Sequence, residues 1–174
     1  GNSSSDIFTS EKNETGWTLP KSIGISVNSP ANEGGIALSN EKNILFFSRC
    51  TGNSEKAECA IYFCRNINGQ WLKPVKLNEN VNVPGFKSFQ PALSSDDGTL
   101  FFASDRPGGY GKLDIWSCSI DEFGNTGVVN NLGVKINTPA DEVTPYYSIN
   151  SKTLYFSSNG HSGAGGLDVF LSEG

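Results

Sequence analysis

The chain of 174 residues contains no methionine, one histidine and three arginines, and it has no long apolar run. Its longest wholly aliphatic and aromatic stretch is residues 44–47, which is far too short to span a membrane. Because a translated protein begins with methionine, we expect the chain to be a processed or excised piece of something longer. The net charge of −5 argues against nucleic-acid binding, since phosphate recognition needs clustered lysine and arginine.

The scarcity of histidine and arginine also bears on catalysis and metal binding. The single histidine, His161, lies among glycines with no cysteine or histidine at ligand spacing, so we expect an exposed loop residue and no metal site. Ser94, Asp96 and Gly98 resemble the Asp-box of sialidases, but three arginines are too few for the cluster such an enzyme needs. No nucleophile elbow, phosphate loop or carboxylate pair appears. The sequence therefore predicts neither an enzyme nor a bound cofactor.

What the chain does contain is a repeat with a constant interval. Four dipeptides, each followed by an aromatic residue, recur at an identical interval of 54: Asp6-Ile7, Ala60-Ile61, Asp114-Ile115 and Asp168-Val169. A linker triplet Asn-x-Pro recurs at nearly the same interval, at residues 28–30, 82–84 and 137–139. A period of about 40 to 55 residues marks a stacked array of small β-units, because one unit cannot bury its apolar face alone.

Each complete period holds four short candidate strands, which in the second unit are residues 35–39, 44–48, 60–65 and 70–77. Four short antiparallel strands per period are typical of a β-propeller blade, although a β-sandwich with coincidental spacing is the alternative. We therefore predict an all-β fold, a β-propeller fragment of about three four-stranded antiparallel blades. The expected boundaries within one partial propeller over 1–174 are 1–30 for the end of a blade, 31–84 and 85–139 for two blades, and 140–174 for the start of another.

Two unpaired sheet edges would remain at the ends of such a fragment. Because free edges and exposed blade faces favour association, we expect self-association or pairing with the rest of the parent propeller.

Residues 91–116 carry a Ser-Asp-Arg-Pro-Gly-Gly-Tyr-Gly loop before Asp114-Ile115-Trp116, and 157–168 hold a weaker copy. This pattern resembles the PD40 repeat, the WD40-like repeat of TolB-type propellers. The loop is similar to that of Bacteroidetes outer-membrane-associated lipoproteins of the OmpA family, including the PorE-type component of the type IX secretion system. There the propeller lies between a tetratricopeptide segment and an OmpA-like peptidoglycan-binding domain. The resemblance implies a periplasmic, outer-membrane-associated scaffold, although the loop at 50–59 departs from the pattern.

The four cysteines divide into two kinds. Cys50 and Cys59 bracket one loop between paired strands, a geometry that allows a disulfide, which we expect. Cys64 and Cys118 are one repeat interval apart, at equivalent places in adjacent blades, where we expect buried free thiols. The aspartates that begin the repeated dipeptides are expected to cap loop amides, because catalytic groups rarely occur once per repeat.

Three hypotheses for function remain open. The first is a non-catalytic interaction module whose partners are proteins of an outer-membrane or secretion complex, with peptidoglycan bound through the parent protein and no nucleic acid. The loops after second and fourth strands share one face of a propeller, and partner contact is expected there. The candidate residues on that face are Lys87, Phe89, Arg106, Tyr110, Lys112, Asp141, Glu142 and His161.

The second hypothesis is a carbohydrate- or peptidoglycan-binding propeller, with Tyr110, Trp116 and Phe89 stacking on sugars. The third is a fragment of a propeller glycosidase. Convergent carboxylates in a pocket would favour the glycosidase, and a flat loop face would favour the interaction module. The Arg-Pro-Gly-Gly segment could equally serve only to make the turn.

Overall fold

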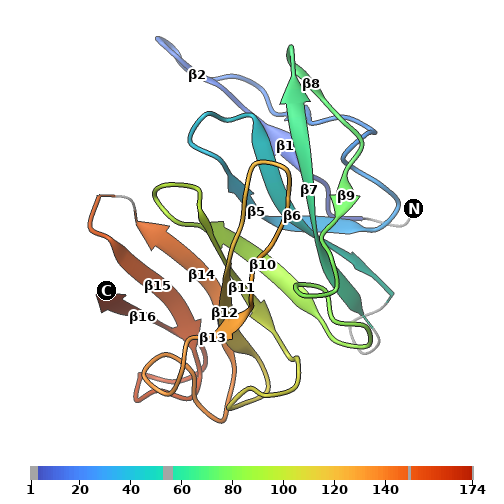
Figure 1. Ribbon diagram of the computed structural model, residues 1–174. Coiled ribbons are helices and arrows are strands. Elements are labelled where there is room, and N and C mark those ends of the chain that lie inside the picture. Colours follow the sequence, from blue (N-terminus) through green and yellow to red (C-terminus); the bar gives the residue numbers. More distant parts are fainter. Residues whose placement is uncertain (1–3, 53–56, 149, 174) are drawn as a thin grey trace.

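The computed structural model describes residues 4–52, 57–148 and 150–173. Every regular element in these ranges is a β-strand, and no helix of the described chain is long and apolar enough to cross a membrane. All the strand pairs of the named sheets are antiparallel (Figure 1). The all-β prediction is confirmed.

The strands form four consecutive groups along the chain. The N-terminal group pairs β1 (Phe8–Thr9) with β4 (Lys21–Ser22), and β2 (Lys12–Asn13) with β3 (Gly16–Trp17). The first blade consists of β5 (Asn32–Leu38), β6 (Ile44–Thr51), β7 (Glu58–Ile67), β8 (Gln70–Trp71) and β9 (Val75–Lys76). The second blade consists of β10 (Ser88–Leu93), β11 (Thr99–Ser104), β12 (Asp114–Ser119) and β13 (Asn130–Asn131). The C-terminal sheet consists of β14 (Glu142–Ser148), β15 (Thr153–Ser158) and β16 (Asp168–Glu173).

The N-terminal group repeats the outer part of the first blade. Phe8 pairs with Ser22 and, one repeat later, Tyr62 pairs with Lys76. The predicted fourth strand at 70–77 is not continuous, because β8 pairs with the far end of β7 while β9 pairs further back. Pro74, which has no N–H to donate, lies in the gap between them. In the N-terminal group and the two blades, the pairing next to the linker is therefore only two residues long, at β4, β9 and β13.

The four groups lie side by side, and the chain termini are at opposite ends of the row (Figure 1). An apolar cluster fills each of the three spaces between successive groups. Leu45 and Phe47 belong to the cluster on one side of the first blade, while Phe46 belongs to the cluster on the other. Both faces of β6 are thus buried, which explains its continuous apolar run.

A β-bulge in each innermost strand links one sheet to the next. The bulges place Gly35, Gln90 and Thr144 at φ values of 52°, 54° and 52°. The Gln90 N–H donates to Ser48 Oγ at 2.7 Å, and the Thr144 N–H donates to Gln90 Oε1 at 2.9 Å. A Cβ atom at Gly35 would lie 3.0 Å from the Gln90 Cα, so glycine permits the close approach of the two blades.

The linker asparagines complete the outer edge of the third strands. In each case Oδ1 accepts a hydrogen bond from a backbone N–H at 2.8–2.9 Å, and Nδ2 donates to the carbonyl of the same residue at 2.9–3.0 Å. The pairs are Asn28 with Ile7, Asn82 with Ile61, and Asn137 with Ile115. The side-chain amide therefore replaces a strand residue, and the Asn-x-Pro triplet marks this contact.

We predict that Asn82→Ala lowers the free energy of unfolding by about 2 to 4 kcal/mol, because it leaves the fully buried Ile61 amide and carbonyl without their side-chain partner. Asn130→Ala is the control, since Asn130 is exposed and its side chain bonds only to Val128 O at 3.2 Å. The control should stay within about 0.5 kcal/mol of the parent in urea denaturation. Equal unfolding midpoints for the two variants would contradict the assigned role of the linker asparagine.

Candidate functional site

The loops that follow second strands and the linkers that follow fourth strands are joined to one another on one face, here called the loop face. The Lys87 N–H donates to Asp105 Oδ1 at 2.6 Å, and the Lys112 N–H donates to Ala140 O at 2.9 Å. The Asp141 N–H donates to Asn159 Oδ1 at 2.9 Å. Backbone groups thus tie the linkers before β10 and β14 to the loops beside them.

Six of the eight candidate residues lie in loops or linkers of the loop face, whereas Phe89 and Glu142 lie in β10 and β14, and only some of the eight are exposed. Tyr110 and Lys112 are exposed, and Lys87, Asp141 and His161 are half-buried. The half-buried Phe89 packs against the apolar cluster between the second blade and the C-terminal sheet. Arg106 and Glu142 are buried, with 7% and 0% exposure, and are therefore unavailable to a partner.

Arg106 is buried because the loop folds its side chain back into the joint between two groups of strands. Its Nη1 donates to Asn80 O at 2.7 Å, its Nη2 donates to Val81 O, and its guanidinium lies over the rings of Phe102 and Trp116 at 4.8 and 5.2 Å. Burial lowers the pKa of Arg106 to about 10, which keeps the guanidinium protonated at neutral pH. The residue expected to contact a partner instead holds a linker in place.

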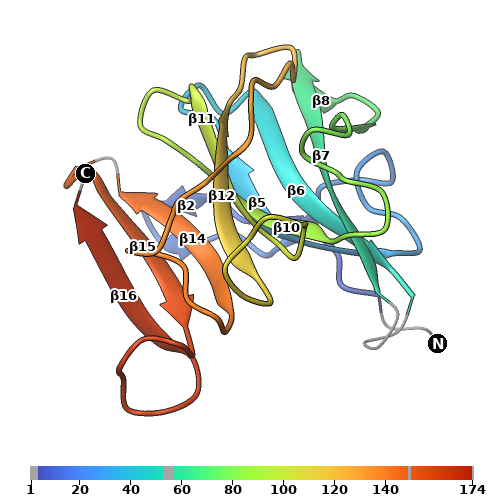
Figure 2. The ribbon, with the colours of Figure 1, turned by 60° about the horizontal axis from the view of Figure 1, so that its bottom comes forward.

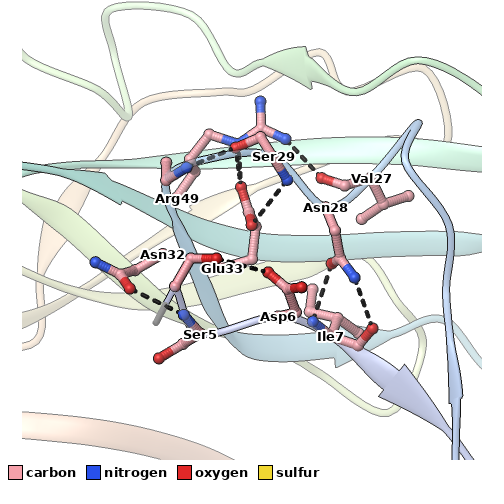
Figure 3. A network of polar contacts seen from close by, with 11 residues as sticks. Ser5, Asp6, Ile7, Val27, Asn28, Ser29, Asn32, Glu33 and Arg49 are labelled. Atoms are coloured by element: carbon pink, nitrogen blue, oxygen red, sulfur yellow. Dashed lines mark hydrogen bonds and ion pairs between the residues drawn. The ribbon is translucent and has the colours of Figure 1, made fainter. Parts of the chain in front are cut away.

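The same arrangement recurs in the other two joints. Arg49 Nη2 donates to Val27 O at 2.7 Å (Figure 3). Its guanidinium lies over the rings of Phe47 and Tyr62 at 5.5 and 4.7 Å. His161, expected to be an exposed loop residue, has Nε2 at 2.8 Å from Ile136 O. Because a carbonyl can only accept, Nε2 carries the proton. The His161 ring also lies 5.8 Å from the ring of Phe156 and 5.1 Å from the ring of Phe170.

We call Arg49, Arg106 and His161 the latch residues. Sequence comparison at a fixed interval misses them, because the latch residues do not follow the constant interval of the repeated dipeptides. Their common signal is structural: each donates to the carbonyl just before a linker asparagine and packs on the aromatic residues of its own second and third strands.

Glu142 is buried because its carboxylate binds the linker that precedes its own strand. It accepts hydrogen bonds from Thr138 N at 2.8 Å, Thr138 Oγ1 at 2.6 Å and Ser158 Oγ at 2.7 Å. Glu33 does the same in the first blade, with Ser29 N at 3.1 Å, Ser29 Oγ at 2.5 Å and Arg49 Nε at 2.7 Å (Figure 3). Both carboxylates therefore form hydrogen bonds that hold the fold together.

The aspartates that begin the third strands also serve the loops. The Asp114 carboxylate accepts from Tyr110 N at 2.5 Å, Gly111 N at 3.1 Å and Asn131 Nδ2 at 2.8 Å. Asp168 accepts from Gly165 N at 3.1 Å. Across the described ranges no group of three histidine, cysteine, aspartate or glutamate residues could hold a metal ion. The carboxylates of these two residues cap loop amides.

A cleft of about 410 Å³ opens on the loop face between the first and second blades. Its walls include Tyr62, Lys76, Phe86 and Lys87, beside the Cys59 end of the disulfide loop. Neither lysine forms an ion pair within the part of the chain that the structure describes, and Phe86 is 39% exposed. The carboxylates of Glu58 and Asp105 also line the cleft, which thus offers two lysine side chains and an aromatic ring beside acidic groups.

The aromatic platform expected for sugar stacking does not form. Trp116 is only 6% exposed and lies beneath Arg106, and Phe89 belongs to an inter-sheet contact. Of the three aromatic residues, only Tyr110 remains exposed.

The cysteines occupy two environments. Cys50 and Cys59 face each other on β6 and β7 and are joined, with an S–S distance of 2.03 Å and Cα atoms 4.1 Å apart. Cys64 and Cys118 are free and buried. Burial raises the pKa of these two thiols to about 12 and about 11, because desolvation disfavours the thiolate.

We predict that Arg106→Ala destabilises the fold by about 2 to 4 kcal/mol, because the Val81 carbonyl loses its buried donor and two rings lose a packed guanidinium. Lys112→Ala, an exposed neighbour on the same loop, should change the unfolding free energy by less than about 0.5 kcal/mol in the same titration. If Arg106→Ala left the free energy of unfolding unchanged, the structural role of Arg106 would be wrong, and the residue would again be a candidate for partner contact.

The cysteine assignment predicts a two-stage alkylation result. Folded protein treated with iodoacetamide near pH 8 should gain almost no label, because the two thiols are buried and remain protonated until the pH approaches 11 to 12. After denaturation without reductant, mass spectrometry should find two modified cysteines. Four modified cysteines would show that Cys50 and Cys59 are not joined in solution.

Comparison with known proteins identifies the fold alone. No family model matches the chain, and no curated protein matches its sequence. A solved structure of a protein assigned as TolB from Agrobacterium tumefaciens is similar, with a TM-score of 0.55 and 18% sequence identity. The match covers 94% of this chain and 55% of that protein, so the chain spans little more than half its length. The four groups of strands are a fragment of a β-propeller.

Proposed function

We propose that the chain is a non-catalytic, protein-binding scaffold that presents its loop face to partners. The observation that carries this proposal is the bonding between neighbouring loops and linkers, which holds the cleft and Tyr110 on a rigid support. Binding residues are commonly found on loops held by a rigid scaffold. The buried carboxylates and arginines of this face are occupied by structural bonds, which leaves contact chemistry rather than catalytic chemistry on the surface.

The cleft defines the kind of partner segment that would fit. Lys76 and Lys87 lie free of ion pairs among the described residues, and Phe86 presents part of its ring beside them. A segment with a carboxylate and an apolar side chain would contact both kinds of group. Exposed charge steers association, while the ring provides buried area.

A periplasmic location fits the disulfide, because such bonds persist in oxidising compartments. The loop at 105–113, with its resemblance to outer-membrane-associated lipoproteins, supports a place at the outer membrane, in a secretion complex of the type IX kind. Attachment to peptidoglycan would then be made by another part of the parent protein.

The test is site-specific photocrosslinking in cells that produce the chain. A crosslinking phenylalanine analogue at Tyr110 or Lys87 should yield a discrete adduct of a second protein. The same analogue at Glu41, which lines a cleft of about 400 Å³ on the opposite face, should not. A Lys76→Glu and Lys87→Glu double variant, carrying the analogue at Tyr110, should weaken the adduct. Equal adducts from both faces would contradict the proposal.

The carbohydrate alternative has its own measurement. Purified chain mixed with peptidoglycan sacculi should remain in the supernatant after centrifugation if the loop face binds protein. Co-sedimentation that is lost in Tyr110→Ala would favour the carbohydrate-binding propeller instead.

A further inference from the structure

A pocket of about 400 Å³ opens at the end of the joint between the first and second blades that lies opposite the loop face. Its walls come from the turn before β6, the turn before β11 and the loop after β12. The two blades lie next to each other, and the loop after β12 reaches across to the first blade (Figure 2). The volume is within the range of small-molecule sites.

The floor of this pocket is the uncovered end of the apolar cluster between the two blades. Phe46, Leu93 and Ile120 are buried members of that cluster, and the half-buried Ile44 packs against it. The exposed ring of Phe123 forms part of the wall. A ligand with a hydrocarbon part would therefore remove apolar surface from water here.

The rim of the pocket carries charge of one sign. Within the described chain, the charged residues that line it are all acidic: Glu41, Asp96, Asp97, Asp121 and Glu122. Arg65 lies outside the lining, with Nη2 3.8 Å from Glu122 Oε2 and its guanidinium 5.5 Å from the Phe123 ring centre. The rim therefore attracts cations, and one guanidinium of the chain itself already lies beside it.

Two of the rim aspartates are held in place by the turn before β11. Asp96 accepts hydrogen bonds from Ser94 Oγ at 2.6 Å and from the Gly98 N–H at 3.1 Å, and these bonds lower the pKa of Asp96. Asp97 Oδ2 accepts a hydrogen bond from the Asn40 N–H at 2.8 Å, which joins the turns of the two blades. The carboxylates on this side of the pocket have fixed positions before any ligand arrives.

The loop after β12 is held with similar precision. Asp121 accepts hydrogen bonds from Asn125 Nδ2 and the Asn125 N–H, both at 2.8 Å, and from the Phe123 N–H at 2.9 Å, and its pKa is lowered by them. Gly124 has a φ of 81°, and a Cβ atom there would collide with the Phe63 ring, so the loop packs closely on the first blade. The rim is therefore preorganised and ionised at neutral pH.

The arrangement of the carboxylates selects among cations. Across the residues that the structure describes, no three acidic, histidine or cysteine side chains could hold a metal ion. The rim charges come from three separate segments around an apolar floor. A matching ligand carries several positive charges separated by hydrocarbon, which is the pattern of ammonium groups joined by methylene chains.

We propose that this pocket is a binding site for a linear aliphatic polyamine. The methylene chain lies on the floor formed by Ile44 and Leu93, and the ammonium groups lie among the carboxylates of the turns and the loop after β12. The exposed face of Phe123 provides a further contact for an ammonium group. The pocket is on the opposite face from the loop-face cleft, so the proposal stands or falls independently of the proposed function.

The test is a calorimetric titration of the whole chain with spermidine at low ionic strength. Spermidine should bind saturably at one site. Hexaamminecobalt(III) has the same charge but no methylene groups, so it should bind about fivefold more weakly, because it gains nothing from the apolar floor. Equal affinities would show attraction by charge alone and would overturn the proposal.

A pair of double variants tests the rim. Glu41→Gln with Glu122→Gln removes two rim charges and should weaken spermidine binding about fivefold. Glu14→Gln with Glu79→Gln removes the same charge from exposed positions outside the pocket and should change the affinity by less than about twofold. Circular dichroism checks that both double variants fold. The same loss of affinity in both would contradict the assigned site.

Amide chemical shifts locate the ligand on the unaltered chain and decide the question if a variant does not fold. Spermidine should shift the amide resonances of Gly98 and Phe123, which line the pocket, and should leave that of Lys87 on the loop face unchanged. The reverse pattern would refute the site. A protein adduct from the crosslinking analogue at Glu41 would assign the pocket to a basic protein segment and would equally refute binding of a free polyamine.

Discussion

Each third strand carries outward backbone groups that a two-residue fourth strand cannot satisfy by itself. At Ile61 and Ile115 these groups are sealed from water, where an unpaired amide or carbonyl costs about 1 to 3 kcal/mol. The linker asparagine removes this cost because its side chain offers an acceptor and a donor with the spacing of a peptide unit. The path of each linker follows from that requirement, and with it the position of the next innermost strand. The stacking of the sheets therefore depends on one side-chain amide per joint.

Fixing the linker in turn creates the loop face. The carbonyl just before the asparagine is held at the joint, where a latch residue from the next group donates to it. That donor is carried by the loop after the second strand, so loop and linker become one unit. The rigidity that makes this face suitable for binding thus has the same origin as the stability of the stack. Substitutions at the joint are expected to alter both, whereas substitutions at Tyr110 or Lys112 alter contact alone.

The periodic part of the fold could be predicted from the sequence because the apolar strands and the Asn-x-Pro linkers recur at a nearly fixed spacing. The contacts that join one group of strands to the next could not be predicted from the sequence. Their hydrogen bonds connect residues 21 to 25 positions apart, through loops of unequal length. Arg106 stands in a glycine-rich loop, a context typical of exposed side chains, and only the structure shows it folded back over Trp116. The sequence predicts a surface position for Glu142 for a similar reason, since its partners Thr138 and Ser158 are adjacent only after folding.

The three joints between successive groups of strands differ in the charged residues that they contain. This difference shows which interaction is common to all three. The first contains an arginine–glutamate pair, Arg49 with Glu33 at 2.7 Å. The second has Arg106 with no carboxylate at ion-pair distance in the described chain, and Ser88 stands where the glutamate would be. The third has Glu142 but a histidine as its latch. Since one joint is paired and the other two are not, a salt bridge is not the common element. The common element is a donor to the linker carbonyl, which agrees with the small net contribution of ion pairs and the large cost of an unsatisfied buried carbonyl.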